Sequence, residues 1–233
     1  MRVDYFLKSK EQITLLPGFI ASTADQKTTT LGRGGSDYSA AIYASALGAD
    51  ELQIWTDVSG LFTANPTLVK QAFAIPHISY QEAMELSHFG AKVIYSPTIQ
   101  PVLEKGIQMV IKNTFAPQDK GTLITKKTDH KNPVKGITHI GGITLLTLEG
   151  SGMVGVPGFS KRLFETLSLQ NINIVLSTQA SSEHSICIGI YDADADKAAK
   201  SINETFDVEI TQHKINPVVV EQGLAIIALV GDT

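Results

Sequence analysis

The residues best suited to chemistry lie in one short segment, Thr29–Tyr38, in which three glycines surround a cation, a hydroxyl and a carboxylate. Glycines let the backbone adopt positive φ angles and approach a ligand closely. Free amides at the start of a following helix attract anions. Within this segment Arg33 can hold a carboxylate or a phosphate through two parallel hydrogen bonds. The composition therefore predicts an anion-binding loop.

Asp37 lies in the first turn of the helix that this loop predicts. One interpretation is that it only favours the helix, because an acid near a helix N-terminus contributes about 0.3 to 1 kcal/mol through the dipole. The other is that it orients a cation or a nucleophile. The segment alone does not choose between these two roles.

The elements that must position this loop alternate between short apolar strands and helices from Pro17 to about residue 125, which predicts an α/β layer with largely parallel strands. A helix beginning at Ser79 is favoured by Glu82 as its capping-box partner. The other expected elements are strands at Gly18–Ala21, Leu52–Val58 and Gln108–Lys112, a helix at Ser36–Leu47 with Ser36 or Asp37 near its cap, and a helix after Pro97.

The composition changes between Lys126 and Lys135, a polar stretch without periodicity that marks a domain boundary. Beyond it the pattern is strand, helix, strand, strand, helix, which predicts a small ferredoxin-like sandwich. In that order the expected ranges are Ile143–Leu148, Gly158–Gln170, Ile172–Thr178, Ser185–Tyr191 and Asp194–Phe206. The apolar run Leu224–Val230 indicates a further buried strand. A strand with no following element to cover it is a pairing liability, so we expect the chain to stop partway into another unit or to pair with another chain.

Composition excludes several classes of protein. The net charge is −4, without a basic stripe for nucleic acid. The longest apolar run is far shorter than the roughly 18 residues of a membrane span. Charged residues near the N-terminus leave no continuous apolar signal segment, so we expect a cytoplasmic protein. Cys187 is the only cysteine and the six histidines lack metal-ligand spacing, so we expect no protein-held metal.

Three segments, in this order, resemble the C-terminal part of the kinase domain of aspartokinases: TTTLGRGGSDY at 28–38, WTDVSGLFTANP at 55–66 and FGAKVIYSP at 89–97. The second half resembles the first ACT module of bifunctional aspartokinase and homoserine dehydrogenase proteins, through GSGMVGVPG at 150–158 and LSTQASSEHSICIGI at 176–190. The implied fold is the C-terminal half of an amino-acid-kinase α/β sandwich followed by a ferredoxin-like ACT domain. The implied ranges are a partial kinase domain at 1–125, a linker at 126–140, an ACT domain at 141–222 and the first strand of a truncated second ACT unit at 223–233.

The resemblance implies transfer of the γ-phosphoryl group of ATP, with Mg²⁺ carried by the nucleotide, to the β-carboxylate of L-aspartate. Arg33 would bind the substrate's α-carboxylate, Gly34 and Ser36 would steady the substrate, and Asp37 would help to organise the catalytic centre. Such a site needs cations and backbone dipoles, because two anionic groups must meet. The residues implied in ATP binding are Thr56, Asp57, Phe62, Lys92 and Val93.

The chain departs from the family pattern at several points. Phe62 replaces a tyrosine that stacks near the nucleotide, Asn65-Pro66-Thr67 replaces Asp-Pro-Arg, and Tyr95 stands where histidine is common. The family's Lys-Phe-Gly-Gly-Thr-Ser segment, whose lysine neutralises the transferred phosphoryl group, occurs nowhere in the 233 residues. Losing such a stabiliser costs about two to three orders of magnitude in rate, so we expect little or no kinase activity from this polypeptide alone.

In the second half the resemblance implies an amino-acid effector site and homo-oligomers formed through ACT domains. The implied effector residues are Met153, Val156, Gly158, Ile174 and Gln179. The resemblance implies threonine as the effector. Val175 occupies a position where lysine-sensitive relatives carry an acid, so lysine would lack its counter-charge. An alternative function is a non-catalytic regulatory subunit of an aspartokinase, although such a subunit has no physical need for Arg33 or Asp37.

Overall fold

The computed structural model describes residues 13–88, 93–127, 133–179 and 184–231. The chain divides into two compact units. The first comprises the described residues up to His139 together with the end of the chain from Ile227, and the second is Ile140–Ile226. Within the described ranges, every helix is too short or too polar to cross a bilayer.

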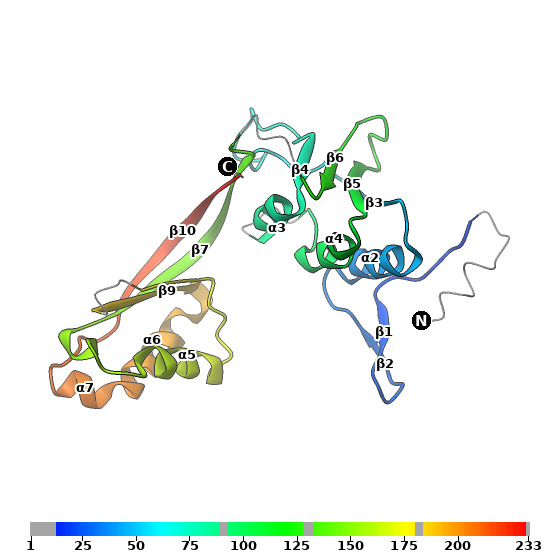
Figure 1. Cartoon of the computed structure of the whole chain (residues 1–233). Coiled ribbons are helices and arrows are strands. Elements are labelled where there is room, and N and C mark those ends of the chain that lie inside the picture. Colours follow the sequence, from blue (N-terminus) through cyan, green and yellow to red (C-terminus); the bar gives the residue numbers. More distant parts are fainter. Residues whose placement is uncertain (1–12, 89–92, 128–132, 180–183, 232–233) are drawn as a thin grey trace. The chain divides into compact units, whose positions relative to one another are not determined.

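The first unit is built on a four-stranded mixed sheet in the order β3-β5-β6-β4 (Figure 1). β3 (Glu51–Thr56) and β5 (Gln108–Asn113) are parallel, β6 (Thr122–Thr125) runs antiparallel to β5, and β4 (His77–Ser79) is parallel to β6. Side chains alternate along β3, with Leu52 and Ile54 buried and Gln53 and Trp55 exposed. One face of β3 therefore joins the core.

Three helices contribute to this core. α2 (Gly35–Leu47) ends at Gly48, whose left-handed backbone closes the helix with bonds to the carbonyls of Ala44 and Ser45. The predicted capping box begins α3 (Tyr80–His88): the Ser79 amide donates to Glu82 Oε2 at 2.8 Å, and the Glu82 amide donates to Ser79 Oγ at 3.1 Å. The helix expected after Pro97 is a 3-10 turn, Ser96–Thr98, continued by α4 (Ile99–Lys105).

A separate antiparallel hairpin precedes α2. It consists of β1 (Ile20–Ser22) and β2 (Thr28–Thr30), with Ile20 opposite Thr30. The strand expected at Gly18–Ala21 is therefore present but starts two residues later. Its partner is β2 and no strand of the four-stranded sheet.

The second unit contains the ferredoxin-like sheet expected from the sequence, in the order β10-β7-β9-β8. The expected order of strand, helix, strand, strand and helix is followed by α7 and by β10, which completes this sheet beside β7. The elements are β7 (Gly136–Glu149), α5 (Phe159–Leu169), β8 (Leu176–Gln179), β9 (Ser185–Tyr191), α6 (Ala195–Thr205), α7 (Asp207–Thr211) and β10 (Val219–Val230). β7 begins inside the stretch predicted as a linker, because its first residues bond to distant partners such as the Thr63 carbonyl.

Aromatic rings and an ion pair hold α5 against the helices at the end of this unit. The Phe159 and Phe206 rings stack with their centroids 5.5 Å apart. The Arg162 guanidinium lies 4.4 Å from the Phe206 centroid, donates to the Thr205 carbonyl at 2.8 Å, and binds both carboxylate oxygens of Glu209. These contacts use the charge, the plane and the donors of the guanidinium together.

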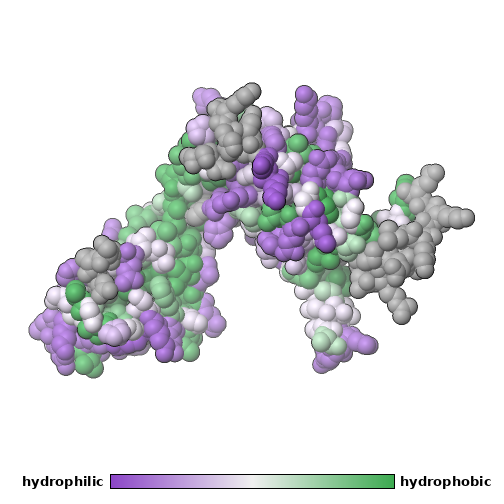
Figure 2. All heavy atoms as spheres, viewed as in Figure 1, coloured by the Kyte–Doolittle hydropathy of each residue, from purple (hydrophilic) through white to green (hydrophobic). Residues whose placement is uncertain are grey.

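The expectation that Leu224–Val230 is a buried strand is wrong for most of its length. β10 is a strand, but Leu224, Ile227 and Leu229 are 38%, 74% and 65% exposed, and only Val230 is buried. Figure 2 shows hydrophobic side chains gathered along β7 and β10. An apolar run predicts burial only when both faces of a strand are covered. Among the described strands β10 bonds only to β7, at the edge of its sheet.

Candidate functional site

The glycine-rich loop leads from β2 into α2 through two left-handed residues. Gly32 and Gly34 have φ angles of 75° and 73°, and Gly34 occupies the N-cap of α2. The expected cap from Ser36 or Asp37 is absent from α2, because the loop turns through Gly34 and no side chain caps the helix. A Cβ at Gly34 would lie 2.4 Å from Cβ of Tyr95, whereas a Cβ at Gly32 would meet nothing within 4 Å. Gly34 is therefore needed for two reasons, its φ angle and its close contact.

The chemically active side chains of this loop face solvent to different degrees. Arg33 and Ser36 are exposed, and Arg33 forms no ion pair within the described part of the chain. Asp37 is half-buried, and this burial raises the pKa of its carboxyl group above the ordinary value. The loop thus offers an unpaired guanidinium among the described residues and, four residues later in the sequence, a carboxyl group whose charge is disfavoured by its burial.

Ser39 fixes the start of α2 through two hydrogen bonds of its hydroxyl. Its hydroxyl is buried, donates to the Gly35 carbonyl at 2.8 Å and accepts the Phe19 amide at 3.0 Å. The Leu31 amide donates to the Phe19 carbonyl at 2.9 Å, which ties the other side of the loop to the same residue. Sequence reasoning missed Ser39, whose signal was only its position one turn after Gly35.

Polar groups gather where β3 and β5 end together. Thr56 pairs with Asn113 across the parallel strands, and Thr56 Oγ1 donates to Asp57 Oδ1 at 3.1 Å. Asn113 Nδ2 donates to Ser59 Oγ at 3.0 Å, and Ser59 Oγ donates to Asp119 Oδ2 at 2.6 Å. Ligands of α/β sheets bind at such carboxyl ends. Asn113, Ser59 and Asp119 join the predicted pair Thr56 and Asp57 and were not foreseen.

Phe62 and Val93 line one cavity of about 260 Å³. Lys92, the third residue expected there, lies outside the described residues. Most of the lining is apolar, with polar groups on a few residues only. The other residues of the lining are Val58, Ala64, Asn65, Pro66, Leu86, Ile137, Thr138 and His139.

Two parts of that lining differ from the expectation. Asn65 shapes the turn itself, since its Oδ1 accepts the Thr67 amide at 3.0 Å and the Thr67 hydroxyl at 2.7 Å. Residues 137–139 belong to β7, in a stretch interpreted from the sequence as linker. No local sequence signal marked residues 137–139, because their place depends on a partner distant in the sequence. The Ile137 amide donates to the Thr63 carbonyl at 2.8 Å.

A second cavity, of about 310 Å³, lies in the second unit at the start of α5. Four of the five expected effector residues line it, namely Met153, Val156, Gly158 and Gln179. Ile174 does not line it and instead packs, partly buried, against the core of this unit. Ser160 was missed by the sequence reasoning, although Ser160 Oγ donates to Gln179 Oε1 at 3.3 Å across the cavity.

This second cavity is suited to a carboxylate. Gly158 is the left-handed N-cap of α5, and the first hydrogen bond of this turn runs from the Arg162 amide to the Gly158 carbonyl at 3.0 Å. The amides of residues 159–161 precede that bond and are the free donors that every helix N-terminus presents. Free amides and the helix dipole attract an anion, while the amide of Gln179 can both donate and accept.

Comparison with known proteins agrees with this arrangement. Residues 2–113 match the amino acid kinase family and residues 146–206 match an ACT domain. The bifunctional aspartokinase/homoserine dehydrogenase of Haemophilus influenzae is 43% identical over 99% of this chain and 28% of its own length. Lysine-sensitive aspartokinase 3 of Escherichia coli is 36% identical over 95% of this chain and 49% of its own length.

Solved structures give the same result. The aspartate kinase of Clostridium acetobutylicum has a TM-score of 0.80 at 30% identity, covering 92% of this chain and 49% of that one. E. coli aspartokinase III in complex with aspartate and ADP has a TM-score of 0.72 at 35% identity, covering 92% and 47%. The fold expected from the sequence is thereby confirmed, and the chain is a member of the aspartokinase family that joins part of an amino acid kinase domain to an ACT domain.

Proposed function

We propose that this chain contributes half of the active site of an aspartate kinase, which transfers the γ-phosphoryl group of ATP to the β-carboxylate of L-aspartate. The chain spans about a quarter of the length of the bifunctional relative and about half of that of aspartokinase 3. The activity belongs to a protein of that larger size. A cytoplasmic location and assembly through ACT domains remain predictions from the sequence.

The observation that carries the proposal is the cavity lined by both Phe62 and Val93, two residues far apart in the sequence that were each expected to hold the nucleotide. Its apolar walls suit a purine ring. Thr56 and Asp57, at the end of β3, offer a hydroxyl and a carboxylate to the polar part of the nucleotide and its Mg²⁺. The ADP bound by E. coli aspartokinase III supports a nucleotide as the ligand.

The glycine-rich loop supplies the group expected to hold aspartate. Arg33 is exposed and has no carboxylate partner among the described residues, so its two-pronged donor is free for the substrate's α-carboxylate. Asp37 lies in the first turn of α2, four residues after this cation. Its carboxylate would orient the reacting groups, while Arg33 and the loop amides offset the negative charge that develops when carboxylate and phosphate meet.

The test joins this chain to the N-terminal kinase segment of the H. influenzae relative and measures aspartate-dependent ADP formation. Arg33→Ala should lower kcat/KM for aspartate by about 10- to 150-fold, the loss expected for one charge-assisted contact of 1.5 to 3 kcal/mol. Lys27→Ala, which removes an exposed cation from the neighbouring hairpin, is the matched control and should leave the rate unchanged. Equal rates for both variants would refute the role of Arg33. We expect the 233-residue chain without that segment to show little or no turnover.

The second cavity is proposed to bind threonine as a feedback effector. The free amides at the start of α5 would take the carboxylate, and Gln179 with Ser160 would meet the hydroxyl or the amino group. Isothermal titration should give a saturable heat with threonine and none with lysine, and Gln179→Leu should abolish the threonine heat. Gln212→Leu, at the end of α7, is the control. Equal heats for both amino acids would remove the case for Gln179.

A further inference from the structure

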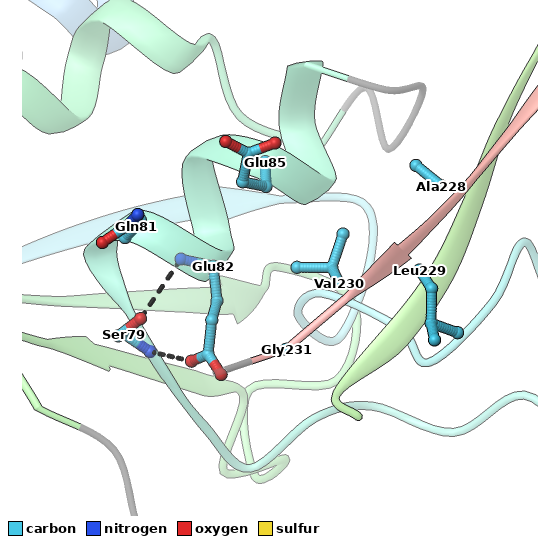
Figure 3. A pocket seen from close by; sticks show the side chains of 8 residues that line it. All are labelled: Ser79, Gln81, Glu82, Glu85, Ala228, Leu229, Val230 and Gly231. Carbon is cyan, nitrogen blue, oxygen red and sulfur yellow. Dashed lines mark hydrogen bonds between the residues drawn. The ribbon is translucent and has the colours of Figure 1, made fainter. Parts of the chain in front are cut away.

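A third cavity, of about 290 Å³, lies in the first unit between α3 and the end of β10. Ser79, Gln81, Glu82 and Glu85 line one side, and Ala228–Gly231 line the other (Figure 3). It shares no lining residue with the cavity of Phe62 and Val93 or with the cavity at α5. The aspartate kinase reaction gives this cavity no role.

Glu82 is the unusual member of the lining. Its side chain is 3% exposed, and Oε2 accepts the Ser79 amide in the capping box. Oε1 is also buried and has no hydrogen-bond partner among the residues that the structure describes. A buried carboxylate oxygen without a donor costs free energy, because the solvation it had in water is lost without replacement. In Figure 3 this second oxygen lies on the side of the carboxylate that faces Gly231.

The capping box does not explain the charge of Glu82. Glutamine serves equally well at this position of a capping box, since one side-chain oxygen suffices to accept the N-cap amide. Oε1 and the negative charge are therefore surplus to the helix. A charged group that local structure does not require, buried against a cavity, calls for a ligand in that cavity.

The chemistry of the lining identifies the class of ligand. Glu82 and Glu85 bring two negative charges, and none of the described residues that line the cavity is a Lys, Arg or His that would balance them. Most polar groups of the lining are oxygen acceptors: the two carboxylates, the Ser79 hydroxyl and the backbone carbonyls of Ala228–Gly231, of which the Val230 carbonyl already accepts the Lys135 amide. Gln81 adds one side-chain amide that can donate as well as accept. Oxygen ligands with net negative charge suit a hard cation such as Mg²⁺ or Ca²⁺.

The space available decides how such an ion would be held. Water takes about 30 Å³ in the liquid, so the cavity has room for a cation that keeps most of its hydration shell. The described residues contain no group of three His, Cys, Asp or Glu side chains suited to a metal. A direct bond to one carboxylate, with the remaining contacts made through water, is how proteins commonly hold Mg²⁺. The Glu85 carboxylate points away from that of Glu82 in Figure 3, so of the two only Glu82 is placed for a direct bond.

We propose that this cavity binds one hydrated divalent cation, with Glu82 Oε1 as the direct ligand and Glu85 acting through its water shell. This ion is distinct from the Mg²⁺ that travels with the nucleotide. The proposal does not depend on the kinase function, because the cavity and the uncompensated oxygen belong to the fold.

The test is isothermal titration of the 233-residue chain with MgCl₂ and with CaCl₂ in 100 mM KCl, without nucleotide. We expect one saturable site with a Kd of about 10⁻⁴ to 10⁻³ M, the range of weak oxygen sites. Glu82→Gln keeps the capping bond and should weaken binding at least tenfold. Glu85→Gln should weaken it by a smaller factor. Glu165→Gln, an exposed site on α5 with the same change of charge, should bind as the parent does.

Each outcome decides the proposal. Circular dichroism first checks that Glu82→Gln is folded, which its retained cap predicts. Equal affinity of Glu82→Gln and Glu165→Gln for either ion would overturn the role of Glu82. No saturable heat up to 10 mM of either ion, or binding of ammonium chloride in place of both, would overturn the assignment of a divalent cation.

Discussion

Replacing Gly34 by alanine tests whether the glycine-rich loop is fixed by its contact with Tyr95. Gly32 and Gly34 have nearly the same φ angle, 75° and 73°, but only Gly34 has a close neighbour, with Tyr95 Cβ at 2.4 Å and Cγ at 2.5 Å from the added carbon. The left-handed backbone alone costs an alanine about 1 to 2 kcal/mol. Overpacking adds about 1 to 3 kcal/mol. Gly32→Ala should therefore cost about 1 to 2 kcal/mol and Gly34→Ala about 2 to 5 kcal/mol.

Urea unfolding followed by tryptophan fluorescence measures this difference in the first structural unit, to which the glycine-rich loop belongs. Trp55 is the only tryptophan and lies on β3, so its signal reports the first unit. With a slope of about 2 kcal/mol per M, the midpoint should fall by about 0.5 to 1 M for Gly32→Ala. For Gly34→Ala it should fall by about 1 to 2.5 M.

A second comparison separates the ring of Tyr95 from its backbone. The atom nearest to the added carbon is Tyr95 Cβ, which alanine retains. Adding Tyr95→Ala to Gly34→Ala should therefore recover only part of the lost stability. Equal midpoints for Gly32→Ala and Gly34→Ala, or full recovery in the double variant, would refute the packing argument.

Three further predictions concern single side chains. Burial raises the pKa of Asp37, so the contribution of its neutral carboxyl group to stability is complete below the unfolded pKa and is lost as pH rises through the folded pKa. Asp37→Asn should therefore raise the thermal midpoint at pH 7 but not at pH 3, and equal gains at both pH values would contradict this. The hydrogen bond from Arg162 lowers the pKa of Glu209, so the charged pair stabilises the fold above the unfolded pKa, and this stabilisation is lost as pH falls through the folded pKa. Glu209→Gln should cost about 1 kcal/mol at pH 7 and nothing at pH 2, followed by circular dichroism, and a cost that does not change with pH would exclude the ion pair. Thr122 Oγ1 is buried, accepts the Leu61 amide and donates to the Ile75 carbonyl. Thr122→Val should lower the free energy of unfolding by about 1 to 3 kcal/mol, measured by urea unfolding with Trp55 fluorescence, and an unchanged midpoint would show these hydrogen bonds to be dispensable.

Local sequence signals predicted the elements whose causes are local. The spacing of Ser79 and Glu82 predicted α3, because both halves of a capping box lie within one helical turn. β9 falls at Ser185–Tyr191 as expected, since alternation along a strand needs no knowledge of its neighbours. The start of β7 was missed for the opposite reason, since its first bonds reach Thr63 and no nearby residue marks them.

The same distinction applies to the candidate sites. Arg33, Asp37 and Gly158 stand in recognisable loops, so their types and spacing pointed to them before any fold was known. The position of Ile174 in the core and the role of Ser160 follow from how distant elements pack. Residue types alone cannot give that packing, and the resemblance carried the role of Ile174 without its geometry.

β7 contributes to both units, because Ile137, Thr138 and His139 line the cavity of Phe62 while Ile143–Glu149 pair with β9. The end of the chain from Ile227 also belongs with the first unit. The second unit therefore has no boundary at which it could be excised, or joined to another kinase, without also dividing the first unit. A cut at residue 140 leaves Ile137–His139 with the first unit but removes the end of the chain from Ile227, whereas a cut before residue 136 carries away both. Exchange of whole two-unit segments is the safer route to chimeric enzymes with altered feedback.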